Sequence, residues 1–191
     1  MNTSKNHDNI DEIYKKIWDC LKLGIKESES DYHTFSLATS DEKLSYNRTV
    51  VLRDYDIEKH TIIFHTNNLS NKIKQIRINT NVSALFYSKD DKIQIRFTGH
   101  ASINNQDEYC DERWNKMHDQ SKKCYYQNIK PGAYVDHPGL VKTEKTDLLS
   151  KDFSIITINI NSIDWLFLSS SGHIRAEYLR SNKFAGKWIA P

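Results

Sequence analysis

The chain has 191 residues, 38% of them hydrophobic and 27% charged, so it is long enough to bury the core of one domain without disulfides. Its 27 Lys and Arg residues nearly balance 25 Asp and Glu residues, and the net charge of +2 gives no support to a nucleic-acid partner. No apolar run approaches the length of a membrane span, residues 1–9 lack the apolar centre of a signal peptide, and three cysteines without a CxxC pair fit a reducing compartment. We therefore expect a single cytoplasmic domain spanning 1–191, with no membrane partner.

Several site classes have no motif in this sequence. There is no GxGxxG, no P-loop and no HExxH, and no nucleophile and base can be paired from spacing. Cys110, His118 and Cys124 come nearest to a metal set, but their spacing matches no zinc signature. We therefore predict no metal site and assign no catalytic side chain.

The first predicted element is a helix within 1–25. The apolar positions that recur there at steps of three and four are Ile10, Ile13, Ile17 and Leu21. Asp8 or Asn9 can cap its start, and Gly24 can end it.

Most of the remaining chain has the pattern of strands joined by turns. Strands are predicted at 32–38, 48–53, 60–66, 82–88, 92–103, 153–160 and 163–169, the last two joined by a short Asn-Ser connection. A short helix is expected at 70–79, a helical and loop insertion at 105–150, and a short tail at 179–191. Six or seven strands without long crossovers, with two or three helices, predict a mainly β (α+β) fold in which an antiparallel sheet closes into a barrel.

One anion site can be proposed from local chemistry. Ser70, Asn71 and Lys72 open the short helix, where free backbone N–H groups, the positive end of the helix dipole and a cation together suit a phosphate. The alternative is a plain N-cap followed by a surface lysine. Arginines in strands are usually solvated, and Trp165 and Trp188 serve either as stacking surfaces or as packing.

The order of several motifs resembles one family. RTVVLR, FHTNNLSNK, NVSALFY and KIQIRFTGHASI, followed by Trp165, SGHIR and WIAP, resemble the pyridoxamine 5′-phosphate oxidase family of FMN-binding split barrels. The similarity covers 32–103 well, 163–191 moderately and 104–150 loosely. It implies an antiparallel split β-barrel with a few flanking helices. It also implies a homodimer with FMN at the subunit interface, so that both chains contribute to each site.

The resemblance implies which residues of this chain contact FMN. They are Arg48, Thr49, Val50, Val51, Leu52, Arg53, His65, Thr66, Asn71, Lys72, Gln94, Gln127, Asn128, Trp165 and Arg175. Arg48 and Lys72 would hold the phosphate, and Gln94 would face the flavin ring. Asn71 stands where the family often has an arginine, which removes one cation.

The substrate residues implied by the resemblance are Arg53, Tyr109, Arg113 and His173. Met117 and Ser171 depart from the family, since they remove a hydroxyl and a charge from the contacts to a substrate phosphate. Arg53 points opposite to Arg48 in a regular strand, so the two cannot meet one phosphate without a bulge, and Arg53 is assigned to the substrate.

The expected function is that of an FMN-dependent oxidoreductase. It would transfer hydride from a small amine or alcohol, pyridoxamine or pyridoxine 5′-phosphate among the candidates, to flavin that oxygen reoxidises. The alternative is a flavin- or haem-binding split barrel without vitamin B6 oxidase activity. A third class is a nucleic-acid-binding barrel that uses Arg96, Tyr87 and the lysines, which the low net charge disfavours.

Overall fold

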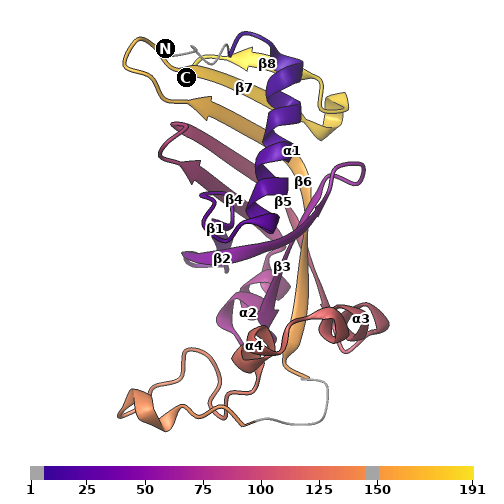
Figure 1. Cartoon of the computed structure of the whole chain (residues 1–191), viewed down its shortest axis with the longest axis vertical. Helices are drawn as coiled ribbons and strands as arrows, with labels where there is room; N and C mark the ends of the chain where they lie inside the picture. The colour runs from indigo at the N-terminus through magenta and orange to yellow at the C-terminus, as the bar shows by residue number, and fades with distance from the viewer. Residues whose placement is uncertain (1–6, 145–150) are drawn as a thin grey trace.

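A closed antiparallel barrel forms the centre of the molecule. The computed structural model describes residues 7–144 and 151–191. Their strands are β1 (Thr34–Ser40), β2 (Ser45–Asp56), β3 (Thr61–Asn67), β4 (Asn81–Ser88), β5 (Ile93–Asn105), β6 (Phe153–Phe167), β7 (Ile174–Leu179) and β8 (Gly186–Ile189). They pair in the order β3-β2-β1-β4-β5-β6-β7-β8, and an additional β3–β6 pairing closes the first six into a barrel. β7 and β8 continue the sheet beyond β6 (Figure 1). The predicted mainly β barrel is confirmed.

The N-terminal helix forms as its pattern predicts but ends later. In α1 (Ile10–Lys26), the side chain of Asn9 caps the first turn by accepting hydrogen bonds from the N–H groups of Asp11 and Glu12. Gly24 does not end the helix. It is buried inside it, where a Cβ would lie 2.1 Å from the carbonyl oxygen of Tyr32, so the residue is small because another backbone passes there.

The predicted break between the last two long strands is wrong. β6 is one strand of 15 residues, and Asn161 lies in it as a bulge: Thr98 of β5 pairs with Ser162, while Gly99 pairs with Ile160. The strand stays continuous because β5 accompanies its whole length, while β3 pairs with its first half and β7 with its second half. A polar Asn-Ser pair is a turn signal only where no neighbouring strand continues across it.

The C-terminal tail is also more ordered than predicted. After β7, a 3-10 turn at Arg180–Asn182 leads into β8, which pairs with β7. The other helices are α2 (Asn71–Ile78), α3 (Glu108–Lys116) and α4 (Asp119–Lys122), with 3-10 turns at Lys123–Tyr125 and Pro138–Leu140. The expected insertion at 105–150 thus contains α3, α4 and a loop, and its last six positions lie outside the described residues. None of the described helices has the length and apolar character needed to span a bilayer.

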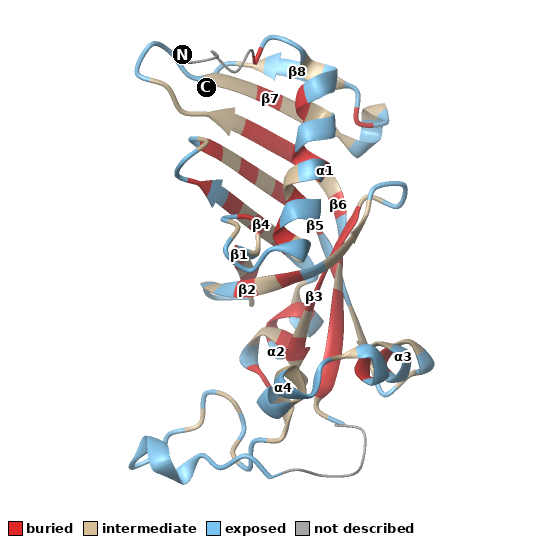
Figure 2. Cartoon of the chain, in the orientation of Figure 1, coloured by how far each residue is buried: buried red, intermediate tan, exposed pale blue. Residues whose placement is uncertain are grey.

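Two separate apolar clusters stabilise the fold. The larger lies inside the barrel and beneath α1, where Ile17 and Trp18 pack with barrel residues such as Phe97. The smaller lies outside the barrel, between α3 and the outer face of β3 and β6, and consists of Ile63, Cys110, Trp114, Phe153 and Ile155. In Figure 2 the buried residues accordingly extend along β6 well below the level of α1. The second cluster positions the side chains of α3 against the barrel.

Candidate functional site

The pairing between β2 and β3 stops halfway along the two strands, which opens the barrel on one side. β2 pairs with β1 from Ser45 to Val51, but with β3 only from Leu52 onward. The end of β3, His65–Asn67, pairs only with β6 in the described chain. Figure 1 shows the two strands diverging from this point. Strand partners are therefore absent on the facing edges of 45–51 and 65–67 within the described residues. The carbonyl oxygen of Asn67 accepts a hydrogen bond from the N–H of Ser70, and 45–51 in particular leaves a backbone edge open to a ligand.

Arg53 marks the point of divergence. The pairing of β2 with β3 shifts between Leu52 and Asp54, which leaves Arg53 as the extra residue of a bulge. A bulge therefore does occur between Arg48 and Arg53, at Arg53 itself. Burial lowers the pKa of His65 and raises the pKa of Tyr125, and the positive charge of Arg53 acts on both, lowering the first further and opposing the rise of the second. The charge of Arg53 is therefore felt by groups beside the outer cluster under α3.

Arg48 lies on the barrel side of β2 and is held by neutral groups. Its Nη1 donates to the carbonyl oxygen of Leu37 at 3.1 Å and to Oγ1 of Thr39 at 2.5 Å. Its Nη2 donates to Oε1 of Gln75 in α2 at 2.8 Å. Thr39 and Gln75 are buried, and they also bond to each other at 2.7 Å. No carboxylate among residues 7–144 and 151–191 pairs with this guanidinium.

Lys72 reaches the same region from the first turn of α2. Its Nζ donates to Oγ1 of Thr66 at 3.0 Å, and Thr66 lies 3.3 Å from Oγ of Ser70, the N-cap residue. Ser70 makes no side-chain bond to the helix N–H groups, so its hydroxyl does not cap them. Burial and then the charge of Arg48 lower the pKa of Lys72.

The two cations therefore share one region without a counter-charge. Burial also lowers the pKa of Arg48, and the described residues supply neither cation with an ion pair. Two desolvated like charges repel each other, and a bound anion relieves that cost. Together with the start of α2, Arg48 and Lys72 form a candidate anion site at the mouth of the split.

The far end of the split meets a second polar cluster under α3. Arg113 forms an ion pair with Asp54, and its guanidinium lies 5.4 Å from the ring centre of Tyr109. Nε2 of His65 is buried, and the described residues give it no hydrogen-bond partner. Burial, followed by the charges of Arg53 and Arg113, lowers the pKa of His65 to about 4, so its imidazole is neutral at pH 7.

Two of the residues expected to contact FMN lie on the face of the sheet opposite to that of Arg48. Gln94 and Arg175 both pair with Leu166 and so face the same side of β6. Arg175 is bound to Asp164 through Nε at 3.1 Å and Nη2 at 2.6 Å, and Arg96 shares that carboxylate. Although burial opposes it, the two arginines lower the pKa of Asp164.

Trp165 lies on the opposite face of β6 from Arg175. It pairs with Ile95 and Ala176, is 2% exposed, and packs against the ring of His7 at 5.1 Å. Within the described chain its ring therefore belongs to the core, and it does not share a surface with Arg175. The ten-residue spacing of the two positions carries no information on which face each one takes.

His173 is far from the other proposed substrate residues. It lies in the exposed connection before β7, where its Nδ1 accepts a hydrogen bond from the N–H of Ser169 at 3.0 Å. Tyr109 and Arg113 pack near Phe153 at the opposite end of β6. A strand of 15 residues spans about 45 Å, so one chain does not bring His173 to Arg113.

Gln127 and Asn128 lie at the base of the loop that follows α4. Gln127 forms a bridge with Thr143, and the side chain of Asn128 accepts from the N–H of Lys142 at 2.9 Å. The loop passes close to the start of α2. A Cβ on Gly132 would lie 3.5 Å from Nδ2 of Asn71.

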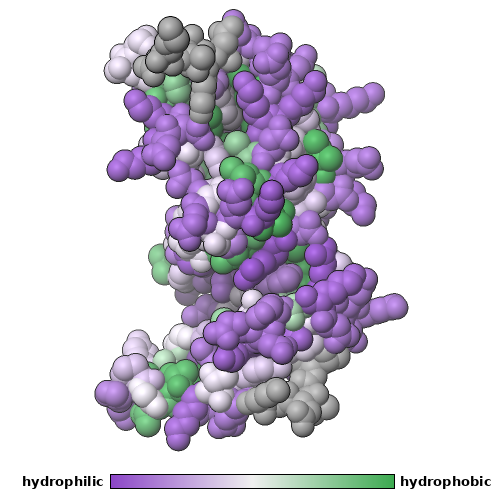
Figure 3. All heavy atoms as spheres, in the orientation of Figure 1, coloured by the Kyte–Doolittle hydropathy of each residue, from purple (hydrophilic) through white to green (hydrophobic). Residues whose placement is uncertain are grey.

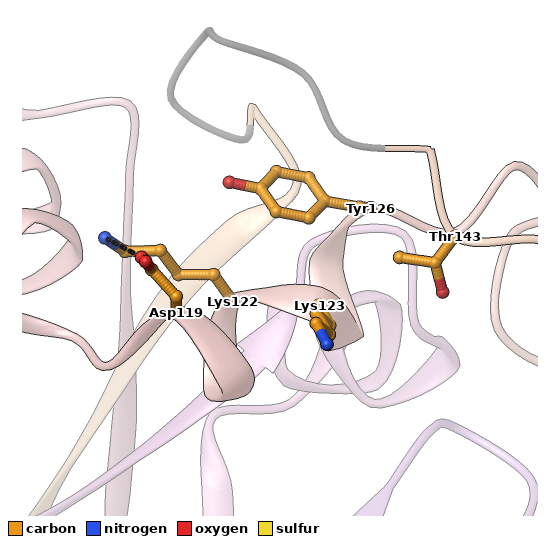
Figure 4. A pocket seen from close by; sticks show the side chains of 5 residues that line it. All are labelled: Asp119, Lys122, Lys123, Tyr126 and Thr143. Atoms are coloured by element: carbon orange, nitrogen blue, oxygen red, sulfur yellow. Dashed lines mark hydrogen bonds and ion pairs between the residues drawn. The ribbon is translucent and has the colours of Figure 1, made fainter.

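A cavity of about 460 Å³ opens beside this base. Figure 4 shows its lining, which comprises Asp119, Lys122, Lys123, Tyr126 and Thr143. Lys122 is paired with Asp119 at 3.4 Å and lies over the ring of Trp114. Within the described residues, no three His, Cys, Asp or Glu side chains gather to hold a metal ion.

Sequence reasoning missed three residues of the site. Thr39 and Gln75 position Arg48, and Asp54 engages Arg113. Thr39 and Gln75 could have been found as polar residues on the inward face of a strand and of a helix. No local pattern indicates that Asp54 pairs with Arg113.

The fold is that of a split-barrel protein, and its opening holds the candidate anion site around Arg48 and Lys72. Residues 15–105 match the family model of the pyridoxamine 5′-phosphate oxidase, FMN-binding domain, and this segment belongs to that family. The match includes β1 to β5 and α2, and therefore Arg48 and Lys72. A search of curated proteins by sequence found no match.

Solved structures share the architecture at low identity. A pyridoxamine 5′-phosphate oxidase-related, FMN-binding protein from Nostoc punctiforme aligns with a TM-score of 0.75 and 19% identity, over 93% of this chain and 96% of its own. PhzG from Burkholderia lata, crystallised with tetrahydrophenazine-1-carboxylic acid, aligns with a TM-score of 0.72 and 15% identity, over 100% and 98%. General stress protein 26 from Bacillus anthracis gives 0.51 and 21%, over 78% and 92%. These alignments show the fold.

Proposed function

We propose that this chain binds FMN in the split between β2 and β3 and acts as an FMN-dependent oxidoreductase. The observation that carries the proposal is the pair formed by Arg48 and Lys72, two desolvated cations without a carboxylate in the described chain. A phosphate monoester supplies the missing negative charge, and the hydroxyls of Thr66 and Ser70 add neutral hydrogen-bonding groups. The family assignment of 15–105 supports the same cofactor.

Different residues along the split would bind the cofactor, orient the substrate and exclude water. The free backbone edge of Thr49–Val51 would hold the cofactor along β2, up to Leu52, where pairing with β3 begins, and the bulge at Arg53. When bound, FMN supplies a two-electron acceptor that oxygen can restore. Arg53, Tyr109 and Arg113 would orient the substrate, and the apolar cluster around Trp114 would exclude water from that end. His65 stays neutral and offers a hydrogen bond rather than a charge.

A second copy of the chain is needed to complete this site. Gln94, Arg175 and His173 lie on surfaces that their own chain does not bring to Arg48 or Arg113. In a homodimer these groups would meet the cofactor and substrate held by the partner. Exposed apolar side chains in the loop after α4 support such an interface: Val135, Leu140 and Val141 are exposed there, and Figure 3 shows hydrophobic surface on that loop.

FMN binding is tested by titration with FMN and with riboflavin, which lacks the phosphate. Flavin fluorescence should show much tighter binding of FMN, and Arg48→Met or Lys72→Met should each weaken it by at least about tenfold, the effect of losing one charge-assisted contact. The matched control is Lys74→Met, since Lys74 is an exposed lysine of the same helix. A colourless protein that takes up no FMN, or one that binds riboflavin equally well, would disprove the proposal.

Oxidase activity on vitamin B6 phosphates is a separate question. Met117 offers no hydroxyl to a substrate phosphate, and Arg113 is already paired with Asp54, which favours a flavin protein that does not oxidise these compounds. A peroxide assay of FMN-loaded protein with pyridoxamine and pyridoxine 5′-phosphates decides between the two. Turnover would identify a vitamin B6 oxidase, and reduction of the bound flavin by another amine or alcohol would identify a different oxidoreductase.

A further inference from the structure

The Asp54–Arg113 ion pair stands where a substrate would meet α3. Asp54 directly follows the bulge residue Arg53, and its Oδ2 accepts a hydrogen bond from Nη2 of Arg113. The two side chains are 36% and 31% exposed, so the pair is open to a ligand. Both line a cavity of about 710 Å³ between α3 and the outer faces of β2, β3 and β6, together with Tyr109.

The charges around this cavity nearly cancel. Arg113 is offset by Asp54, and Asp56 is paired with Lys59 at 3.4 Å. Arg53, the bulge residue next to Asp54, does not line the cavity, although its charge acts on His65. The charged side chains that line the cavity are therefore balanced, with Arg53 as an adjacent positive charge, so a ligand with one negative charge is tolerated more easily than one with two.

A phosphate monoester does not suit this arrangement. It carries about 1.5 to 2 negative charges at pH 7 and needs arginines that are not already engaged. To bind it, Arg113 would have to release Asp54, which would leave a carboxylate beside the phosphate. A carboxylate ligand brings a single charge, and Arg113 has further N–H donors beside the group that Asp54 occupies.

We propose that Asp54 makes this end of the substrate site selective for a monocarboxylate over a phosphate monoester. The inference rests on the proposed function, because it takes Arg53, Tyr109 and Arg113 as the groups that orient the substrate. Asp54 is a specificity-determining residue in this reading, and it acts by occupying the arginine that a phosphate requires.

The test uses two ligands that share one ring, benzoate and phenyl phosphate. Calorimetric titration of the FMN-loaded wild-type protein should show binding of benzoate and weaker binding of phenyl phosphate. Asp54→Asn should strengthen phenyl phosphate binding by at least about tenfold, the value of one freed charge-assisted contact, and leave benzoate within about threefold. Asp56→Asn is the control, because Asp56 lines the same cavity and is paired with Lys59 instead.

The outcomes separate this inference from the proposed function. FMN content is read from the absorbance of the bound flavin before each titration, and protein that holds no FMN refutes the proposed function. Flavin-loaded wild-type protein that binds phenyl phosphate as tightly as benzoate, or that binds neither, overturns the inference. An Asp54→Asn protein with unchanged phenyl phosphate affinity does the same. If that variant does not fold, Asp54→Ser frees Arg113 in the same way.

Discussion

His65 should make the stability of this protein depend on pH between about 4 and 6.5. Its pKa in the folded chain is lowered to about 4 by burial and by Arg53 and Arg113, while an unfolded histidine titrates near 6.5. Above 6.5 neither state binds the proton, and between the two values only the unfolded state does. Stability therefore falls as pH is lowered through this window, by about 2 kcal/mol between pH 7.5 and 5 and by about 3 kcal/mol in full.

The assay compares urea unfolding of the wild-type protein and the His65→Gln variant at pH 7.5 and pH 5. Glutamine does not titrate, so the loss of unfolding free energy at pH 5 should be smaller in the variant by about 2 kcal/mol. His100→Gln serves as the control, since His100 is an exposed histidine of β5. If the wild-type protein and the His65→Gln variant lose the same free energy between the two pH values, the reasoning about His65 is wrong.

Two further substitutions test the split and the bulge. Lys72→Met should stabilise the flavin-free protein by about 0.5–2 kcal/mol while weakening FMN binding, because it removes a desolvated cation beside Arg48; a lowered thermal midpoint would contradict this. Gly99→Ala should destabilise the fold by at least about 3 kcal/mol or prevent folding, because a Cβ there would lie 2.0 Å from the carbonyl oxygen of Asn159 in β6. Urea unfolding measures the second effect, and an unchanged midpoint would show that the two strands separate easily at this point.

Local patterns predicted most elements of the fold. Alternation placed Phe35 and Leu37 on one face of β1, and both are buried, while a three-and-four repeat placed Ile13 and Ile17 on the buried face of α1. The resemblance to a known family then indicated which positions along β2, β3 and α2 to associate with a phosphate. The strand and helix predictions succeeded because each depends on neighbours within one or two turns of chain, whereas the phosphate positions stay a prediction.

Features that depend on distant partners escaped prediction. The continuity of β6 across Asn161 follows from β5 running alongside it, and β8 forms because β7 offers a free edge. The burial of Trp165 follows from the face that β6 turns towards the core. In each case the deciding partner lies far away in the chain, and no local periodicity reports it.

The alternating strands and the amphipathic helix were thus determined by the amino-acid order, because side-chain direction follows from backbone geometry within a segment. The candidate phosphate residues were indicated by the chemistry of Ser70–Lys72 and, for Arg48, by the family resemblance. The hydrogen bonds of Arg48 to Thr39 and Gln75, the divergence of β2 from β3 and the ion pair of Arg113 with Asp54 came only with the folded barrel. Closure of the sheet sets these contacts, since β3 must leave β2 at the bulge in order to follow β6, and that constraint belongs to the whole set of strands rather than to any one of them.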